Sequence, residues 1–216
     1  MAGEAAALRG SIHFGVTPAL LSSLATPVLA DILADSNDVR VLLSVRHSSE
    51  MVRLVQEAQL DLALGFGVEH VPADIVRTRV ARQRYRLVVR GGHPLQGRAP
   101  SLEALSRLQW LLPTPDATIR AEINRAFADA GLGAPDVRVE TNVSASLLLP
   151  LLRRCDMVAV LAEQPVLPLQ SLGLTVLDIE FPALVGDIAI YHRRLTPSVG
   201  LLMNLKERLV AQAQAS

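Results

Sequence analysis

Hydroxyl-bearing residues stand where an apolar strand of this sequence gives way to a helical segment. The stretch Ile12–Val16 alternates apolar with smaller or polar residues, which is the two-residue period of a strand, and Thr17 and Pro18 follow at once. Threonine is a good N-cap and proline is tolerated in the first helical turn, so this pair predicts a helix start. Free backbone N–H groups at such a junction bind small ligands, anions above all.

The same arrangement recurs twice along the chain, at junctions that hold Ser48, Ser49, Asn142 and Ser144. We expect the three junctions to face one cleft. Each hydroxyl also has a second interpretation, because a Ser or Thr ahead of a helix caps it and contributes about 1 kcal/mol without touching a ligand. The convergence of several such residues is what favours a ligand site over simple capping.

The remaining chemistry-bearing residues do not form a catalytic or metal-binding pattern. The single Cys155 excludes an internal disulfide and any multi-cysteine metal site, and its sequence neighbours include no histidine that would activate a thiolate. His13, His47 and His93 have no second ligand at metal spacing. No serine elbow, phosphate-binding loop or paired-carboxylate pattern is present. We therefore expect no enzyme activity, no metal and no cofactor.

Composition narrows the function classes further. Lys+Arg and Asp+Glu both number 21 in 216 residues, and a neutral chain argues against a dedicated nucleic-acid surface. Aromatic residues make up 3%, which argues against stacking platforms for single strands. The longest apolar run, Leu147–Leu152, is far shorter than the roughly 20 residues that span a bilayer, and no signal peptide is recognisable. These features predict a cytoplasmic protein.

The elements that must position the hydroxyls alternate along the first half of the chain. A helix runs from Pro18 to about Asp35, and Pro27 predicts its division into two pieces. The strands Val39–Arg46 and Leu60–Gly65 flank a second helix, Glu50–Gln59. This strand–helix–strand–helix–strand order is typical of a parallel sheet with right-handed crossovers.

The second half of the chain does not continue this regular alternation of strands and helices. Two arginine-rich strands are expected, at Ile75–Val80 and Arg84–Arg90. Shorter elements follow, among them a strand with the only tryptophan, Trp110, a helix over Val143–Arg154, and a last helix that starts at Thr196.

The segments LDLALGF, RLVVRGGHPL, ETNVSASLLLPLL and VAVLAEQP, in this order and spacing, resemble the effector-binding domain of LysR-type transcriptional regulators. The resemblance extends from about Gly10 to Val210, and the LDLAL strand and the turn at His93-Pro94-Leu95 are its most specific marks. One departure is Cys155-Asp156-Met157, which stands where the family usually has a Gly-x-Gly turn.

The resemblance implies an α/β fold of the type 2 periplasmic-binding-protein kind, with two lobes joined by two crossing strands. Residues 10–80 plus 178–216 would form lobe one, residues 81–177 lobe two, and residues 1–9 a linker remnant. A small, anionic organic effector would bind in the cleft between the lobes. The residues that correspond to the family's pocket, or that lie close to it, are Thr17, Pro18, Ala19, Ser48, Ser49, Phe66, Arg84, Thr114, Thr118, Asn142 and Ser144.

Arg84 carries two interpretations. It lies near the first crossing strand, where a guanidinium can bind an anion bidentately. Alternating arginines are also typical of the solvated face of a half-buried strand.

The family also implies partners. The domain would form a homodimer, with the first helix of each subunit against the C-terminal helix of the other, and a tetramer in the full-length protein. DNA would be bound only by a winged helix-turn-helix outside this chain. A type 2 solute-binding protein of a transport system is the alternative function, and it would need an export signal or a lipidation cysteine near the N-terminus.

Overall fold

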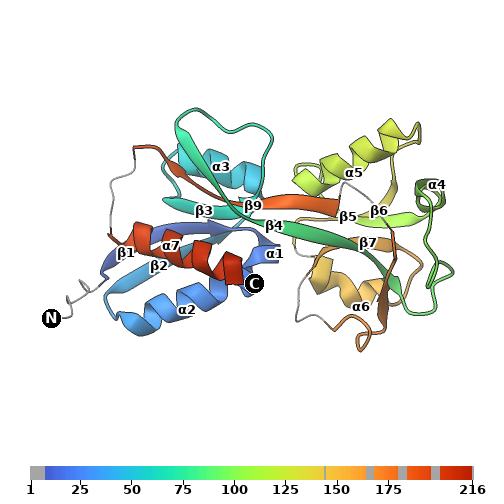
Figure 1. Cartoon of the computed structure of the whole chain (residues 1–216), viewed down its shortest axis with the longest axis horizontal. Coiled ribbons are helices and arrows are strands. Elements are labelled where there is room, and N and C mark those ends of the chain that lie inside the picture. Colours follow the sequence, from blue (N-terminus) through green and yellow to red (C-terminus); the bar gives the residue numbers. More distant parts are fainter. Residues whose placement is uncertain (1–7, 144, 164–167, 180–183, 196–199, 216) are drawn as a thin grey trace. The chain divides into compact units, whose positions relative to one another are not determined.

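The computed structural model describes residues 8–143, 145–163, 168–179, 184–195 and 200–215. The chain divides into two compact units, Met1–Ala81 with Asp187–Ser216, and Arg82–Gly186. The chain therefore leaves the first unit after residue 81 and returns to it after residue 186. The sequence-based assignment placed these two boundaries after residues 80 and 177. Each unit has its own sheet and helices (Figure 1).

The sheet of the first unit has the strand order β2-β1-β3-β9. These strands are β1 (Gly10–Val16), β2 (Val39–Val45), β3 (Leu62–Phe66) and β9 (Val185–Arg193). Strand β1 is parallel to both β2 and β3, whereas β9 is antiparallel to β3. The parallel arrangement expected from the alternation of strands and helices is confirmed. The carboxyl ends of β1, β2 and β3 therefore lie at one edge of the sheet.

The first helix differs from its prediction at Pro27. The segments α1 (Pro18–Leu20), a π-helical turn (Leu21–Ala25) and α2 (Thr26–Asp35) follow one another without a break. The backbone N–H and the hydroxyl of Thr26 both donate to the Leu21 carbonyl, the latter over 2.8 Å. This wider turn relieves the clash between a proline ring and the carbonyl four residues earlier, so Pro27 widens the helix instead of dividing it.

The helices of the first unit pack against its sheet, and their buried side chains belong to two core clusters. The continuous helix buries Leu20, Leu24, Val28 and Ile32 in one cluster, which also receives the last helix, α7 (Gly200–Ala215). Helix α3 (Ser48–Gln56) packs into the other cluster through Met51, Val52 and Val55. Among the described residues, only Pro18–Asp35 is long and apolar enough to cross a membrane, by length and composition alone. Leu20, Leu24, Val28 and Ile32 of this segment are buried in the core of the unit.

The second unit begins within one long strand. Strand β4 runs unbroken from Ile75 to Arg90, so the expectation of two separate strands is wrong. No glycine or proline interrupts residues 80–84, and Gln83 supports the crossing because its side-chain amide donates to the carbonyl of Glu163 over 3.1 Å. Strand β4 pairs antiparallel with β7 (Val158–Ala162) and β8 (Leu174–Val176).

The parallel part of the second sheet is formed by β5 (Gln109–Pro113), which pairs with β6 (Asp136–Thr141) and with β7. Helices α4 (Leu102–Ser106) and α5 (Thr118–Asp129) precede and follow β5. Trp110 is fully buried against Phe127 of α5, with ring centroids 5.7 Å apart.

The helix expected over Val143–Arg154 is shorter in the structure. A 3₁₀ turn (Ala145–Leu148) leads into a single α-helical turn, α6 (Leu149–Leu152). Pro150 has no N–H to donate to the carbonyl four residues earlier, so a regular α-helix cannot pass through this point with its bonds intact. In the loop that departs from the family pattern, Asp156 accepts a hydrogen bond from Arg90 Nε over 2.6 Å.

His192 of β9 contacts Lys206 of α7. His192 lies with Nδ1 2.9 Å from the Arg193 carbonyl and Nε2 3.0 Å from Lys206 Nζ, so a neutral ring donates at one nitrogen and accepts from the ammonium at the other. Burial and, to a smaller extent, the Lys206 charge lower the pKa of His192 below its ordinary value of 6.5. The unfolded chain binds this proton more readily than the folded chain does.

We therefore expect the free energy of unfolding to fall as the pH drops below about 6.5. The pH dependence should be less steep in His192→Gln, whereas the similarly lowered pKa of His93 leaves part of the slope in place. Urea unfolding at a series of pH values, with an NMR titration of the imidazoles, measures both effects. A His192 that titrates at or above its ordinary value would contradict this assignment.

Candidate functional site

The carboxyl edge of the first unit's sheet brings together three residues that the sequence singled out. The backbone N–H of Thr17, directly after β1, donates to the Leu64 carbonyl of β3 over 3.1 Å. The N–H of Phe66, the last residue of β3, donates to Ser48 Oγ over 2.8 Å. Thr17, Ser48 and Phe66 thus meet where three parallel strands end, which is the usual place for ligands in open α/β sheets.

Thr17 carries the most informative polar atom of this edge. The residue is 2% exposed, and its Oγ1 is buried without a hydrogen-bond partner among the described residues. Its backbone occupies the N-cap position of α1, yet its side chain makes no capping bond. Capping therefore does not account for this hydroxyl. A buried hydroxyl without a partner costs about 1–3 kcal/mol, so a ligand group that bonds to it would recover that free energy.

Ser48 is the first residue of α3, and His47 holds the N-cap position. Ser48 is 6% exposed, and its Oγ accepts from Phe66, which leaves the hydroxyl proton able to donate. The close approach depends on Gly65, because a Cβ at that position would lie 2.7 Å from Ser48 Oγ. Ser48 therefore joins the start of α3 to the end of β3.

The neighbouring candidates occupy the same edge. Pro18 and Ala19 form the first turn of α1 and are half-buried, and Ser49 is exposed in the first turn of α3. The N-terminus of α3 carries the positive end of the helix dipole, which favours a negatively charged ligand group. Arg46 and Glu50, 3.4 Å apart, form an ion pair beside it.

Tyr191 is a residue of this edge that sequence reasoning missed. Its hydroxyl donates to the Phe66 carbonyl over 2.8 Å and accepts from the Val68 N–H over 3.1 Å. Burial raises the pKa of this hydroxyl. A tyrosine within the apolar strand Ile188–His192 is a weak signal, because its ring alone fits a core strand and the hydroxyl contacts arise from pairing between distant segments.

The candidates of the second unit gather at the carboxyl edge of its parallel strands. The N–H of Thr114 donates to the Thr141 carbonyl over 3.1 Å, and Asn142 follows Thr141 as an exposed residue. Thr118 is the first residue of α5. The structure thus brings Thr114 and Asn142 to one edge of this sheet, next to the loop that leads into α5. Ser144 lies outside the described residues.

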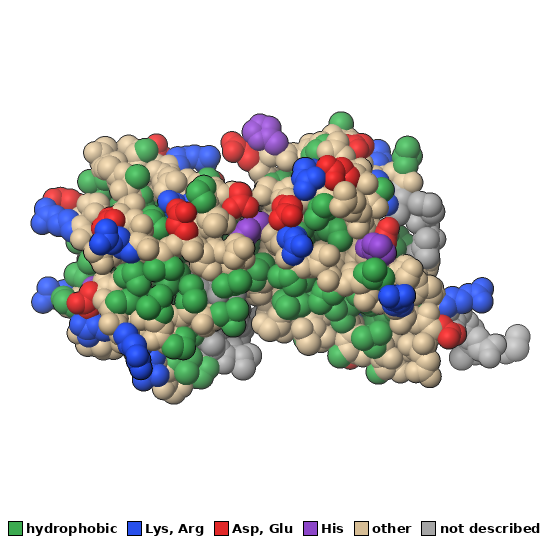
Figure 2. Space-filling model, turned by 180° about the vertical axis from the view of Figure 1, so that it is seen from behind, with side chains coloured by type: hydrophobic (Ala, Val, Ile, Leu, Met, Phe, Trp, Pro, Cys, Tyr) green, Lys and Arg blue, Asp and Glu red, His purple; other side chains and the backbone are tan. Residues whose placement is uncertain are grey.

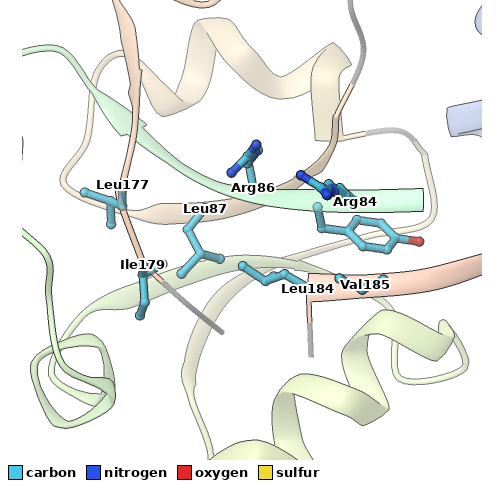
Figure 3. A pocket seen from close by; sticks show the side chains of 8 residues that line it. Arg84, Arg86, Leu87, Leu177, Ile179, Leu184 and Val185 are labelled. Carbon is cyan, nitrogen blue, oxygen red and sulfur yellow. The ribbon is translucent and has the colours of Figure 1, made fainter. Parts of the chain in front are cut away.

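Arg84 has a different setting. It is exposed on β4 and contributes to a hollow of about 250 Å³ in the second unit. Figure 3 shows the Arg84 and Arg86 side chains on the face of the strand opposite to Leu87, whose side chain points toward Leu184. Arg86 is paired with Glu163 at 2.8 Å. Apolar side chains and the two arginines share the walls of the hollow.

Figure 2 shows charged side chains of both signs on the face it displays, together with groups of apolar ones. In the part of the chain that the structure describes, no three His, Cys, Asp or Glu side chains are grouped so that they could hold a metal ion.

Comparisons with known proteins agree with this fold. The sequence pattern of the family described as LysR substrate binding domain matches residues 5–213. The transcriptional regulator GalR of Pseudomonas putida is 26% identical over 212 residues, which cover 95% of this chain and 53% of GalR. GbpR of Azospirillum brasilense is 26% identical over 156 residues, 71% of this chain and 45% of GbpR. The chain spans about half the length of these curated relatives, both of which are named as HTH-type transcriptional regulators.

Solved structures of low sequence identity have the same fold. The effector-binding domain of QuiR, in complex with shikimate, superimposes with a TM-score of 0.80 at 15% identity and covers 96% of this chain and 98% of that one. The regulatory domain of Synechocystis CcmR, in complex with 2-PG, gives 0.79 at 17% identity, with 94% and 98% covered. The resemblance and the type 2 periplasmic-binding-protein fold expected from the sequence are confirmed. This chain belongs to the LysR substrate-binding domain family.

Proposed function

We propose that this chain is the effector-sensing domain of a LysR-type transcriptional regulator and that it binds a small anionic organic molecule at the carboxyl edge of the first unit. The observation that carries the proposal is the hydroxyl of Thr17, which is buried and has no hydrogen-bond partner among the described residues. Membership of the family supports the sensing role, since the relatives are regulators rather than transport proteins or enzymes.

The chemistry of this edge suits a carboxylate. Thr17 and Ser48 offer hydroxyl donors, and α3 begins at Ser48 with the positive end of its helix dipole. Donors of this kind, together with the helix dipole, bind an anionic group without requiring a lysine or arginine. Phe66 would lie against the body of the molecule.

We extend the proposal to Arg84, Thr114, Thr118, Asn142 and Ser144 of the second unit, as contacts for the other end of the ligand. A ligand that touches both units changes their equilibrium arrangement only by the difference between its affinities for the alternative arrangements. Transcriptional control would then pass to a DNA-binding winged helix-turn-helix outside this chain, in the cytoplasm, where such regulators meet DNA.

The first test is a thermal-shift screen with acetate, succinate, benzoate and shikimate as probes. A probe present at 100 times its Kd should stabilise the folded chain by about 2.7 kcal/mol. Thr17→Val keeps the shape of the side chain and removes only the hydroxyl. We expect this variant to weaken binding by about 1–2 kcal/mol while the ligand-free protein is as stable as the parent or more so, because no native hydrogen bond is lost.

Ser48 variants provide the matched control. Ser48→Asp retains an acceptor for the Phe66 N–H and places a negative charge at the site, whereas Ser48→Ala removes that acceptor without adding charge. An anionic ligand should therefore bind least well to Ser48→Asp. Unchanged affinity in Thr17→Val and in both Ser48 variants would place the ligand elsewhere, and the absence of a shift with every probe would contradict a carboxylate effector.

We also propose that the domain forms a homodimer through the continuous first helix and α7. Leu24 and Leu205, which lie in these two helices, are buried in the unit's own core, so other side chains would have to form the interface. Among the described residues of this unit, the large apolar side chains that remain exposed are Leu33 of α2, Leu42 and Leu43 of the edge strand β2, Leu195 after β9, and Met203 of α7. A two-fold interface would use such a surface twice.

Sedimentation at increasing concentration tests the assembly. We expect a dimer at hundreds of micromolar, and Leu33→Glu together with Met203→Glu should shift the equilibrium to monomer because each charge would be buried at the interface. Val176→Glu is the control, since it places a charge on an exposed apolar residue of the second unit. A monomer at the highest concentration would rule out the proposed dimer.

A further inference from the structure

We infer that Tyr191 is a positioning residue of the effector site and that its hydroxyl holds the segment 66–68 in the geometry the ligand meets. The inference rests on the proposed function. It adds Tyr191 of β9, which is not one of the residues proposed to contact the ligand. All the groups involved belong to the first unit.

The hydroxyl of Tyr191 joins two backbone groups, one in the last residue of β3 and one just beyond it. It donates to the Phe66 carbonyl over 2.8 Å and accepts from the Val68 N–H over 3.1 Å. The N–H of Phe66 is bound at the same time by Ser48 Oγ, over 2.8 Å. Phe66 is therefore held from both sides, by α3 through its N–H and by β9 through its carbonyl.

A second set of contacts fixes the outer side of the same segment. The N–H of Gly67 donates to the Asp187 carbonyl over 2.8 Å. The Arg77 guanidinium pairs with the Asp187 carboxylate at 3.1 Å and reaches the Val68 carbonyl at 3.4 Å. It lies so close to Gly67 that a Cβ there would be 2.6 Å from Arg77 Nη2. The segment consequently has little freedom to adopt another backbone path.

Packing alone does not require a hydroxyl at this position. The Tyr191 ring lies fully buried in the cluster of Met51, Val52 and Val55, where a phenylalanine would fill the same space. Both hydrogen bonds of the hydroxyl go to Phe66 and Val68, at the end of β3 and directly after it. A tyrosine hydroxyl keeps its proton at neutral pH, and burial raises its pKa further, so this hydroxyl donates to the Phe66 carbonyl. Without it, a carbonyl and an N–H would lose their partners together.

The experiment compares Tyr191→Phe with the parent and with Ile32→Val, a core change in α2 that contacts a different cluster. The probe is the carboxylate of the panel above that gives the largest thermal shift, and its Kd is measured by calorimetry well below the unfolding temperature of each variant. We expect Kd to rise about tenfold in Tyr191→Phe, the factor that corresponds to one net hydrogen bond, and to change less than about twofold in Ile32→Val. Hydrogen exchange of the Val68 amide, without ligand, should be faster in Tyr191→Phe only.

The outcomes separate the two proposals. Weaker binding in Thr17→Val with parental binding in Tyr191→Phe would overturn the positioning role and leave the site in place. Parental binding in both would overturn the site. Equal losses in Tyr191→Phe and Ile32→Val would mean that affinity follows global stability, which also overturns the positioning role. If no probe binds, the proposed function fails. If hydrogen exchange of the Val68 amide is also the same in Tyr191→Phe as in the parent, the hydroxyl does not hold the segment 66–68 in place.

Discussion

The parallel pairing of β1 with both β2 and β3 is the constraint on which the candidate site depends. Val16 is opposite Val45 on one side and Leu64 on the other, so the next residues of all three strands emerge at one edge. A register shift by one residue in either pair would turn the side chains of a strand to the opposite face of the sheet. Thr17 and Ser48 could not then keep their common neighbours in β3.

Helix α3 packs closely on β1 and β3, which brings its first residue, Ser48, next to the end of β3. Cβ atoms at Gly15 and Gly65 would lie 2.9 Å from Met51 Sδ and 3.0 Å from Met51 Cε. The far end of α3 is held by Arg193, which donates to the carbonyls of Val55 and Leu60 over 2.7 and 2.8 Å. With the helix fixed at both ends, Ser48 reaches the Phe66 N–H.

The sequence was sufficient for the features that local chemistry decides. Apolar alternation and the Thr17-Pro18 pair located β1 and the start of α1, because strand period and helix initiation depend on neighbouring residues. It was insufficient where a distant contact decides. Pro27 predicted a break, but a hydrogen-bond pattern five residues wide accommodated it. Tyr191 looked like one more core residue, because the partners of its hydroxyl are about 125 residues away in the chain.

The hydroxyls of Ser48 and Thr17 at this edge differ in what they cost the stability of the fold. Ser48 is partly satisfied by Phe66, so the start of α3 is stable without a ligand. Thr17 is buried with its Oγ1 unpaired among the described residues, and this destabilises the empty site relative to an apolar replacement. A residue that folding alone favoured would be valine, which has the same shape and no hydroxyl to satisfy. In the proposed function, a ligand oxygen would accept the hydrogen bond that Thr17 Oγ1 can donate, and this bond would link the unpaired hydroxyl to binding.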